Sequence, residues 1–167
     1  MFYDYPMIGL YMGRFQPFHK GHLHLIKEAL KEVKKLIIVV AVPLRKTEKD
    51  PFSAEERKKM VELALKEEGL LNKVVIYTLS DIPSDSEYVG HVRLHVPGFN
   101  VVFVGDNSLN QKLFSEAKFT VKTCARYKGI NSTDIRQMMR TRKGWEGMVP
   151  KSVADYIKKN NLVKKVI

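Results

Sequence analysis

Short apolar runs alternate with amphipathic stretches along this chain. The clearest run covers residues 36–42, which are all apolar and mostly β-branched, as in a strand that is buried on both faces of a parallel sheet. Four further runs, rich in apolar and β-branched residues, predict strands at residues 7–12, 74–79, 101–104 and 119–123. Because helical patterns separate these strands, the sequence predicts an α/β domain with a five-stranded parallel sheet.

Helices are predicted between the strands, where apolar residues recur three and four positions apart. The first begins near Leu23. The second follows Ser53, which can cap it with Glu56 as the partner in a capping box, and it ends at Gly69. The remaining helices are predicted at residues 88–94, 111–116, 133–142 and 152–159. These elements predict one doubly wound, Rossmann-like domain over residues 1–167, closed by C-terminal helices, with its ligand site at the carboxyl ends of the strands.

The composition is basic. Of 167 residues, 29 are Lys or Arg and 18 are Asp or Glu, so the net charge is +11. Such a protein attracts anions, from nucleic acids to nucleotides and phosphorylated metabolites, and the charge alone does not choose between them. Many of the lysines alternate with glutamates in predicted helices, as on solvated helix faces. The arginines beside glycine and histidine in loops are therefore the better functional candidates.

The sequence also limits the compartment and the metal chemistry. Cys124 is the only cysteine, which excludes an internal disulfide, a Cys-x-x-Cys pair and a multi-cysteine zinc site. No apolar run approaches the ~20 residues of a membrane span, and the N-terminus lacks the features of a secretory signal. We therefore expect a cytoplasmic protein without a membrane partner.

The loop after the first predicted strand, residues 13–22 (GRFQPFHKGH), holds the strongest candidate site. It matches neither the dinucleotide fingerprint nor the Walker loop. Instead, His19 and His22 stand three residues apart at the start of a helix, where they can share one face and where free backbone N–H groups favour an anion. With Arg14 just upstream, these residues predict a phosphate site. Zinc is a weaker alternative, because His24 would add a third imidazole but no acidic residue lies in the loop.

A second anion site is predicted near the C-terminus. Ser132 or Thr133 can cap the helix that starts there, and Asp134 in its first turn suits the helix dipole. Arg136 shares a face with both hydroxyls and can form a planar fork on a phosphate. Taken alone, the same residues also fit a well-capped helix without a ligand.

Four segments together resemble the HxGH nucleotidyltransferases, and within them the archaeal-type nicotinamide mononucleotide adenylyltransferases. The ten-residue loop is the most specific match, and residues 50–57, 88–91 and 131–136 extend it over nearly the whole chain. The resemblance implies that the 5′-phosphate of a mononucleotide attacks the α-phosphorus of ATP, which yields NAD and pyrophosphate. Since a phosphate monoester is already an anion at neutral pH, this reaction needs no general base.

The resemblance also assigns roles to individual residues. The catalytic residues, which hold and neutralise the reacting phosphates, are His19, His22, Arg14 and Arg136. The further contacts to ATP and its phosphates are Gly13, Phe15, Gln16, Lys49, Arg57, Ser132 and Thr133. The residues expected around the acceptor are Ile82, Asp85, Tyr88, Gly105 and Asp106.

The expected partners follow from the same resemblance. Mg²⁺ would arrive with ATP and need few protein ligands, so no metal site is expected in the protein itself. The substrates are ATP and a mononucleotide, and no nucleic acid partner is expected. The resemblance also implies a homo-oligomer, with the hexamer as the form common among archaeal relatives.

The chain departs from the family pattern where the pyridine nucleotide should bind. A family tryptophan that stacks on the nicotinamide ring corresponds to Tyr88, a nearby asparagine to Asp85, and residues 41–46 are shorter and more basic than the family segment. Tyr88 can still stack, and Asp85 suits a cationic ring. The acceptor could instead be phosphopantetheine, flavin mononucleotide or a sugar or polyol phosphate, with ATP or CTP as the donor.

Two other functional classes stay open at this point. One is a basic nucleic-acid-binding module, although such modules interleave base-stacking aromatics with arginine, whereas the aromatics here fall mostly within apolar strands or beside the histidine loop. The other is a nucleotide sensor without turnover.

Overall fold

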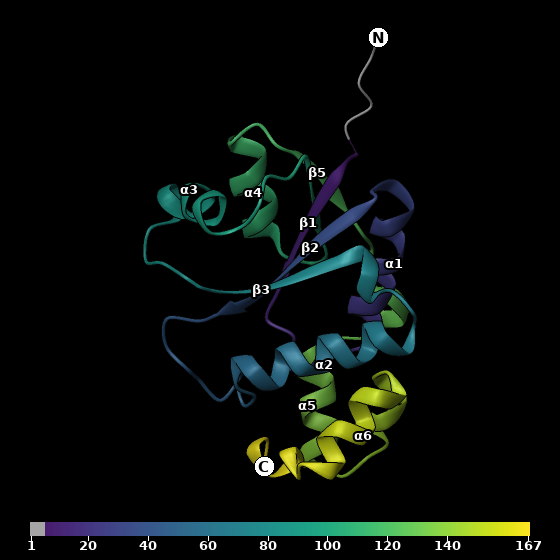
Figure 1. The fold of residues 1–167 in the computed structure, drawn as a ribbon. Helices are drawn as coiled ribbons and strands as arrows, with labels where there is room; N and C mark the ends of the chain where they lie inside the picture. The colour runs from purple at the N-terminus through teal and green to yellow at the C-terminus, as the bar shows by residue number, and fades with distance from the viewer. Residues whose placement is uncertain (1–5) are drawn as a thin grey trace.

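A five-stranded, all-parallel sheet forms the centre of the protein (Figure 1), in the computed structural model that describes residues 6–167. The strand order is β3-β2-β1-β4-β5. The strands are β1 (Ile8–Gly13), β2 (Lys35–Val42), β3 (Val74–Ser80), β4 (Val101–Val104) and β5 (Thr120–Thr123). The predicted α/β class and the five-stranded parallel sheet are confirmed, and the predicted strand ends differ from the observed ones by one residue at most.

Helices cover both faces of the sheet (Figure 1). One layer consists of α1 (Lys20–Glu32), α2 (Ala54–Glu67), α5 (Ser132–Arg140) and α6 (Lys151–Lys159), and the other of α3 (Asp85–His95) and α4 (Ser108–Glu116). Short 3-10 helices lie at Leu71–Lys73, Tyr127–Gly129, Trp145–Met148 and Leu162–Lys165. Within the described residues, no helix has the length and apolar character needed to cross a bilayer.

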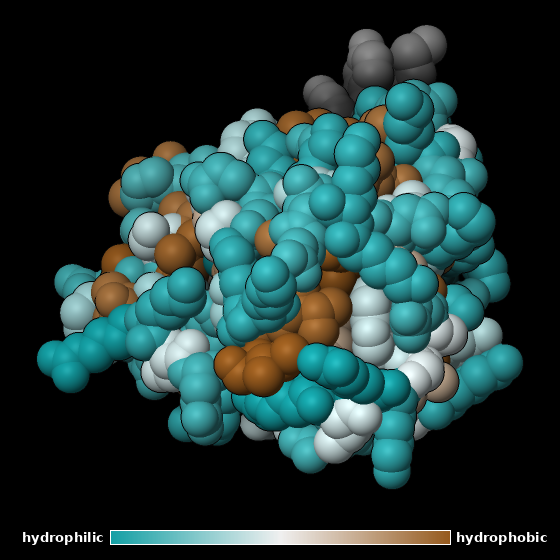
Figure 2. Space-filling view, turned by 90° about the horizontal axis from the view of Figure 1, so that it is seen from below, coloured by the Kyte–Doolittle hydropathy of each residue, from teal (hydrophilic) through white to brown (hydrophobic). Residues whose placement is uncertain are grey.

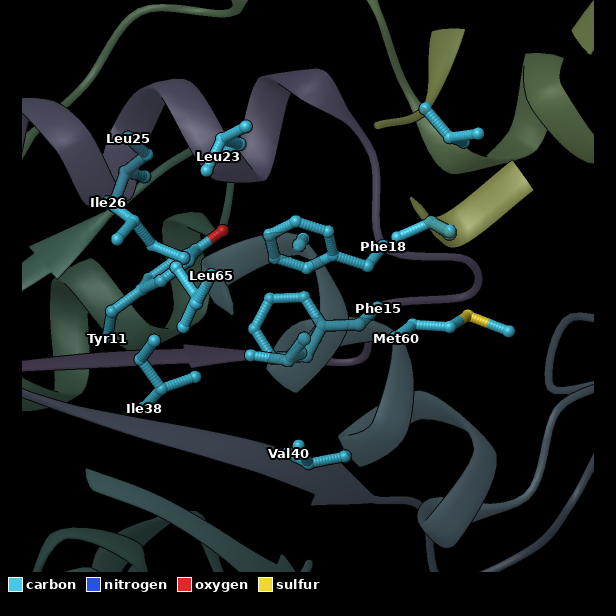
Figure 3. Close-up of a cluster of buried hydrophobic side chains, with 14 of the residues drawn as sticks. Tyr11, Phe15, Phe18, Leu23, Leu25, Ile26, Ile38, Val40, Met60 and Leu65 are labelled. Atoms are coloured by element: carbon cyan, nitrogen blue, oxygen red, sulfur yellow. The ribbon is translucent and has the colours of Figure 1, made fainter. Parts of the chain in front are cut away.

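The sheet separates two apolar cores, and β2 contributes to both. Leu36, Ile38 and Val40 point into the larger core with α1, α2, α5 and α6, part of which Figure 3 shows. Ile37 and Val39 point into the smaller core beneath α3 and α4. Successive side chains of a strand face opposite sides, so a strand covered on both faces must be apolar throughout. This is why residues 36–42 form an uninterrupted apolar run.

The structure confirms the predicted N-terminal cap of one helix and corrects that of another. Ser53 Oγ accepts from the backbone N–H of Glu56 at 3.2 Å, and Glu56 Oε2 accepts from the N–H of Ser53 at 2.8 Å, which completes the predicted capping box. For α5, however, the cap is Asn131, whose side-chain oxygen accepts from the N–H of Asp134 at 2.9 Å. The prediction that Ser132 or Thr133 caps this helix is wrong, because the helix starts one residue earlier than the pattern indicated.

The surface agrees with the charged composition. Seen from below in Figure 2, it is mostly hydrophilic, with apolar side chains showing near the centre of this face and along its left side. Charged residues make up 28% of the chain. Charge is therefore spread over the surface and does not by itself mark a functional site.

Candidate active site

Two clefts lie side by side at the carboxyl end of the sheet, where the strand order reverses between β1 and β4. Open α/β sheets bind ligands at this kind of switch point. The first, which we call the histidine cleft, measures about 480 Å³ and is lined by His19 and His22. The second, the tyrosine cleft, measures about 510 Å³ and is lined by Tyr88. Gly13 and Arg14, at the end of β1, line both clefts and so form their shared border.

The two histidines of the loop are locked together at the start of α1. Their rings stack with centroids 3.5 Å apart and planes inclined by 19°. His19 Nδ1 accepts from the backbone N–H groups of Gly21 at 3.1 Å and His22 at 3.3 Å, while His22 Nδ1 accepts from the N–H of His19 at 3.2 Å. His19 is thus the helix cap and His22 its partner in a capping box.

These hydrogen bonds fix the tautomer of both rings. A ring nitrogen that accepts a backbone hydrogen bond carries a lone pair, so the proton of each neutral imidazole must sit on Nε2. Burial and nearby Arg126 lower the pKa of His19 to about 4, and burial and the neighbouring His19 lower the pKa of His22 well below its ordinary value. Near neutral pH the histidine cleft is therefore lined by two uncharged imidazoles whose Nε2–H groups are available as hydrogen-bond donors.

This arrangement predicts a pH-dependent stability. Between pH 6.5 and about 4, the unfolded chain takes up a proton at His19 and the folded protein does not. The free energy of unfolding should consequently fall as the pH drops through this window, with His19 accounting for up to about 3 kcal/mol. Urea unfolding at pH 7, 5.5 and 4.5 measures this change. His19→Asn should show a shallower fall than the parent protein, and an identical fall in the two would contradict the prediction.

Two glycines are required by close approach to aromatic rings. A methyl group at Gly21 would lie 2.9 Å from Cε1 and 3.0 Å from Nδ1 of His19, and one at Gly13 would lie 2.6 Å from the Phe15 ring. Phe15 itself adopts a φ of 53°, in the left-handed region, and its buried ring turns back over β1. Both glycines are therefore explained by the space that the loop needs.

Arg14 stands between two carboxylates. Its guanidinium lies 3.5 Å from Asp50 Oδ1 and 3.8 Å from Asp81 Oδ2. Asp50 is buried, and its Oδ1 has no hydrogen-bond partner within residues 6–167. The ion pair with Arg14 therefore offsets part of the cost of burying this carboxylate. Burial raises the pKa of Asp81 although Arg14 opposes this effect. The two carboxylates thus orient the arginine that borders both clefts.

Three other predicted site residues hold the loop in place instead of lining a cleft. The Gln16 amide is bonded to both backbone polar groups of Phe52, each at 3.0 Å. Arg57 is buried, and its Nη1 donates to the carbonyl oxygens of Arg14 at 2.6 Å and Ala41 at 2.7 Å. Arg136 donates from Nη1 to the carbonyl of Gln16 at 2.8 Å, and its Nη2 lies 3.4 Å from Thr133 Oγ1.

The structure thus brings together part of the predicted site. The predicted residues that line the histidine cleft are Gly13, Arg14, His19, His22, Gly105, Asp106 and Ser132. Those that line the tyrosine cleft are Gly13, Arg14, Ile82, Asp85 and Tyr88. Lining neither cleft are Phe15, Gln16, Lys49, Arg57, Thr133 and Arg136. Gly105 and Asp106 were assigned to the acceptor, yet they lie on the histidine side, because they follow β4 and not β3.

The sequence reasoning also missed an ion pair across the histidine cleft. Arg126, which follows β5, forms an ion pair and a hydrogen bond with Asp106, which follows β4. Both residues line the cleft. Their positions just after predicted strands were the available signal, since the carboxyl ends of neighbouring parallel strands meet at one edge.

Tyr88 is the aromatic residue that lines the tyrosine cleft. Its hydroxyl contacts the sulfur of Met12 at 4.0 Å, and the side chain is half-buried. Burial, together with nearby Asp81, raises the pKa of Tyr88 to about 12, so the phenol stays neutral. The cleft thus offers an aromatic ring with carboxylates at Asp81 and Asp85 nearby.

Solved structures with the same fold were found by comparison. A bifunctional NMN adenylyltransferase/ADP ribose pyrophosphatase from Francisella tularensis, complexed with AMP and a manganese ion, superimposes with a TM-score of 0.70 at 30% sequence identity. The match covers 96% of this chain and 52% of that one, so this chain spans about half the length of the bifunctional protein. A second structure from the same organism gives a TM-score of 0.70 at 28% identity.

Sequence comparisons extend the similarity. The family model described as cytidylyltransferase-like matches residues 10–138. Relatives named nicotinamide-nucleotide adenylyltransferase are 39% identical in Pyrobaculum arsenaticum, over 90% of this chain and 87% of the relative, and 40% identical in Ignicoccus hospitalis, over 96% of both chains. With such identities sustained over nearly its whole length, the chain belongs to the cytidylyltransferase-like family and, within it, to the group of the nicotinamide-nucleotide adenylyltransferases.

Proposed function

We propose that this protein transfers the adenylyl group of ATP to nicotinamide mononucleotide, forming NAD and pyrophosphate. The observation that carries the proposal is the border between the clefts, where Arg14 faces both the imidazole donors of one cleft and the aromatic ring of the other. The names of the relatives agree with this activity, and a structural neighbour at 30% identity was crystallised with AMP.

The two substrates fit the two clefts by their chemistry. Uncharged imidazole donors, Arg14 and the positive end of the α1 helix dipole suit the phosphates of ATP in the histidine cleft, although the N–H groups of Gly21 and His22 are already bonded to His19. The ring of Tyr88, with Asp85 close by, suits a flat cationic pyridinium in the tyrosine cleft. Since Arg14 borders both, the phosphate of the acceptor and the α-phosphate of ATP meet there, which is the geometry that a direct transfer requires.

The residues act by positioning and by hydrogen bonding. The acceptor phosphate attacks the α-phosphorus of ATP, the bond to the bridging oxygen breaks, and pyrophosphate leaves with the electron pair. Negative charge spreads over the transferred group and the leaving group, where the Nε2–H groups of His19 and His22 and the guanidinium of Arg14 stabilise it. Because the imidazoles are neutral before the reaction, they donate hydrogen bonds without needing to be protonated from solvent.

A divalent cation is proposed to enter with ATP. Among residues 6–167, no three His, Cys, Asp or Glu side chains gather as a metal site, and the histidine cleft presents mainly N–H donors, which bind anions. Asp106 is the carboxylate in that cleft, and Arg126 already pairs with it. Phosphate oxygens would thus supply most ligands of Mg²⁺, which neutralises part of the triphosphate charge. We further propose a cytoplasmic homo-oligomer without a nucleic acid partner.

Product analysis tests the proposed activity. The protein is incubated with ATP, Mg²⁺ and one of several phosphorylated acceptors, namely nicotinamide mononucleotide, nicotinic acid mononucleotide, phosphopantetheine, flavin mononucleotide or a polyol phosphate, and the products are identified by mass. NAD is expected from nicotinamide mononucleotide. Adenylylation of phosphopantetheine, flavin mononucleotide or a polyol phosphate, without a product from either pyridine mononucleotide, would overturn the pyridine assignment and leave the nucleotidyl transfer. No turnover with any acceptor would favour the sensor.

The tyrosine cleft yields its own prediction. Tyr88→Ala should weaken binding of nicotinamide mononucleotide by about 1–2 kcal/mol, the scale of aromatic and cation–π contacts, with little change in ATP affinity. Tyr88→Trp should preserve or improve binding of the acceptor. Titration calorimetry with each substrate measures both. A larger loss of ATP affinity than of acceptor affinity would show that Tyr88 does not serve the acceptor.

Asp85→Asn is the matched test of charge in the same cleft. Removing the carboxylate should reduce the preference for nicotinamide mononucleotide over nicotinic acid mononucleotide, because the nicotinic acid ring adds a negative charge. An unchanged ratio of the two affinities would exclude Asp85 from acceptor selection.

A further inference from the structure

Tyr11 presents a buried phenol that none of the interactions above explains. It lies in β1, two residues before the cleft border, and only 5% of its surface is exposed. Its ring packs edge-on against Phe15, with centroids 5.7 Å apart and planes inclined by 76°. Figure 3 shows the side chain extending from the strand into the apolar cluster beneath α1. Packing alone would be served equally well by phenylalanine, so the hydroxyl calls for a separate explanation.

The hydroxyl of Tyr11 has no partner in the described part of the chain, residues 6–167, where no other residue forms a hydrogen bond with it. The fully enclosed side-chain polar atoms without a partner are Asp50 Oδ1 and Ser152 Oγ, and Tyr11 Oη is not among them. Tyr11 is among the residues that line the histidine cleft, so this cleft is the space from which a ligand atom can reach the hydroxyl. Burial raises the pKa of this phenol above its ordinary value, so it stays protonated and can donate as well as accept.

Apolar residues surround Tyr11 where it lines the cleft. Tyr11 is in register with Phe103 of β4, two residues before Gly105. A methyl group at Gly105 would lie 3.7 Å from Leu25, and Leu25 shares the apolar cluster of Tyr11. These residues form an apolar part of the cleft wall beside the Tyr11 hydroxyl, whereas the imidazoles and Arg14 supply polar and charged groups. A nucleotide has the same division, with a base and sugar at one end and phosphates at the other.

We propose that the Tyr11 hydroxyl forms a hydrogen bond with the nucleoside half of ATP and so helps to select the donor nucleotide. The identity of the ligand rests on the proposed function, and the role of Tyr11 rests on the unpartnered hydroxyl in the cleft. The bond contributes to binding of ATP and not to the chemistry at phosphorus. Its loss should consequently raise the KM for ATP and leave kcat nearly unchanged.

Tyr11→Phe is the direct test, because it removes one oxygen and keeps the ring. The expected result is a roughly 3- to 10-fold weaker Kd for ATP by titration calorimetry, the range for loss of one neutral hydrogen bond. The KM for ATP should rise by the same factor, while the KM for nicotinamide mononucleotide and kcat stay within about 2-fold. Tyr156→Phe, on α6 and outside both clefts, is the matched control and should change none of these values.

ATP analogues locate the partner of the hydroxyl. With 2′-deoxy-ATP, the penalty of Tyr11→Phe should disappear if the ribose 2′-hydroxyl is the partner, and with purine riboside triphosphate it should disappear if the 6-amino group is the partner. A penalty retained with both analogues places the bond on a remaining nitrogen or hydroxyl of the nucleoside, still within the proposal. A penalty of equal size with inorganic triphosphate would overturn it, since that ligand has no nucleoside.

The outcomes separate this proposal from the proposed function. If Tyr11→Phe binds ATP as tightly as the parent, or if it weakens both substrates equally, the Tyr11 proposal is overturned while NAD formation by the parent still stands. If the parent binds ATP but makes no NAD, the function is overturned and the affinity ratio still decides the role of Tyr11. Absence of ATP binding by the parent would overturn both.

Discussion

Replacing His19 with asparagine is expected to lower kcat by roughly 10² to 10³ while the protein stays folded. The reason is that His19 has two separate tasks in the structure. Its Nδ1 accepts backbone N–H groups at the start of α1, which an asparagine oxygen can also do. In the proposed mechanism its Nε2–H stabilises charge that grows in the transition state, and loss of one such donor lowers kcat by about that factor. Steady-state kinetics measures the loss of kcat, and thermal unfolding of the same preparation measures whether the cap of α1 is kept.

Two further variants make this test decisive. His19→Ala should lose the same activity and, in addition, about 0.5–2 kcal/mol of stability, because alanine cannot cap the helix. His95→Asn, on α3 and away from both clefts, should leave kcat unchanged. Retention of kcat within a few-fold by both His19→Asn and His22→Asn would remove the imidazoles from the mechanism and return them to a structural role.

A single methyl group at Gly21 is expected to reduce kcat by about 10²-fold. With the backbone unchanged, the new Cβ would lie 2.9 Å from Cε1 of His19, so the imidazole must move. A misplacement of about 1 Å at a catalytic group can cost this much. Stability should change less than activity, since the gain from alanine as the better helix former offsets part of what displacement of the His19 cap costs.

Gly90→Ala is the control for Gly21→Ala. Gly90 is also helical, in α3, and a methyl group there would meet no atom of the described residues within 4 Å. This variant should gain a little stability and keep full activity. If Gly21→Ala behaves in the same way, the ring of His19 tolerates displacement, and the tight fit between Gly21 and His19 has no bearing on catalysis.

The strands and most helices could be predicted from the sequence because each depends on residues that are close together in the chain. The strand ends follow from apolar runs, and the capping box at Ser53 follows from two residues three positions apart. The start of α5 was misjudged for the same local reason. Asn131, Ser132 and Thr133 are all good caps, and only the three-dimensional path of the chain selects Asn131.

The site was predicted less completely because several of its residues act over long sequence distances. Gln16 bonds the backbone of Phe52, and Arg57 bonds the carbonyl of Arg14. Nothing near these residues in the sequence distinguishes a side chain that contacts a phosphate from one that holds a loop. Tyr11 was missed since a lone tyrosine in an apolar strand is, by pattern, an ordinary core residue.

The common border of the clefts also has a consequence for how new specificities could arise. The parts that belong to the tyrosine cleft alone include the segment after β2 and the start of α3, whereas the imidazoles and the segment after β5 belong to the histidine cleft alone. With the clefts assigned as proposed, changes in residues 43–47 or 82–88 can therefore alter the second substrate while Arg14, its partner Asp81 and the imidazoles stay in place. Separate loops thus line the two clefts. A protein engineer who wants a different dinucleotide product would first change residues of the tyrosine cleft.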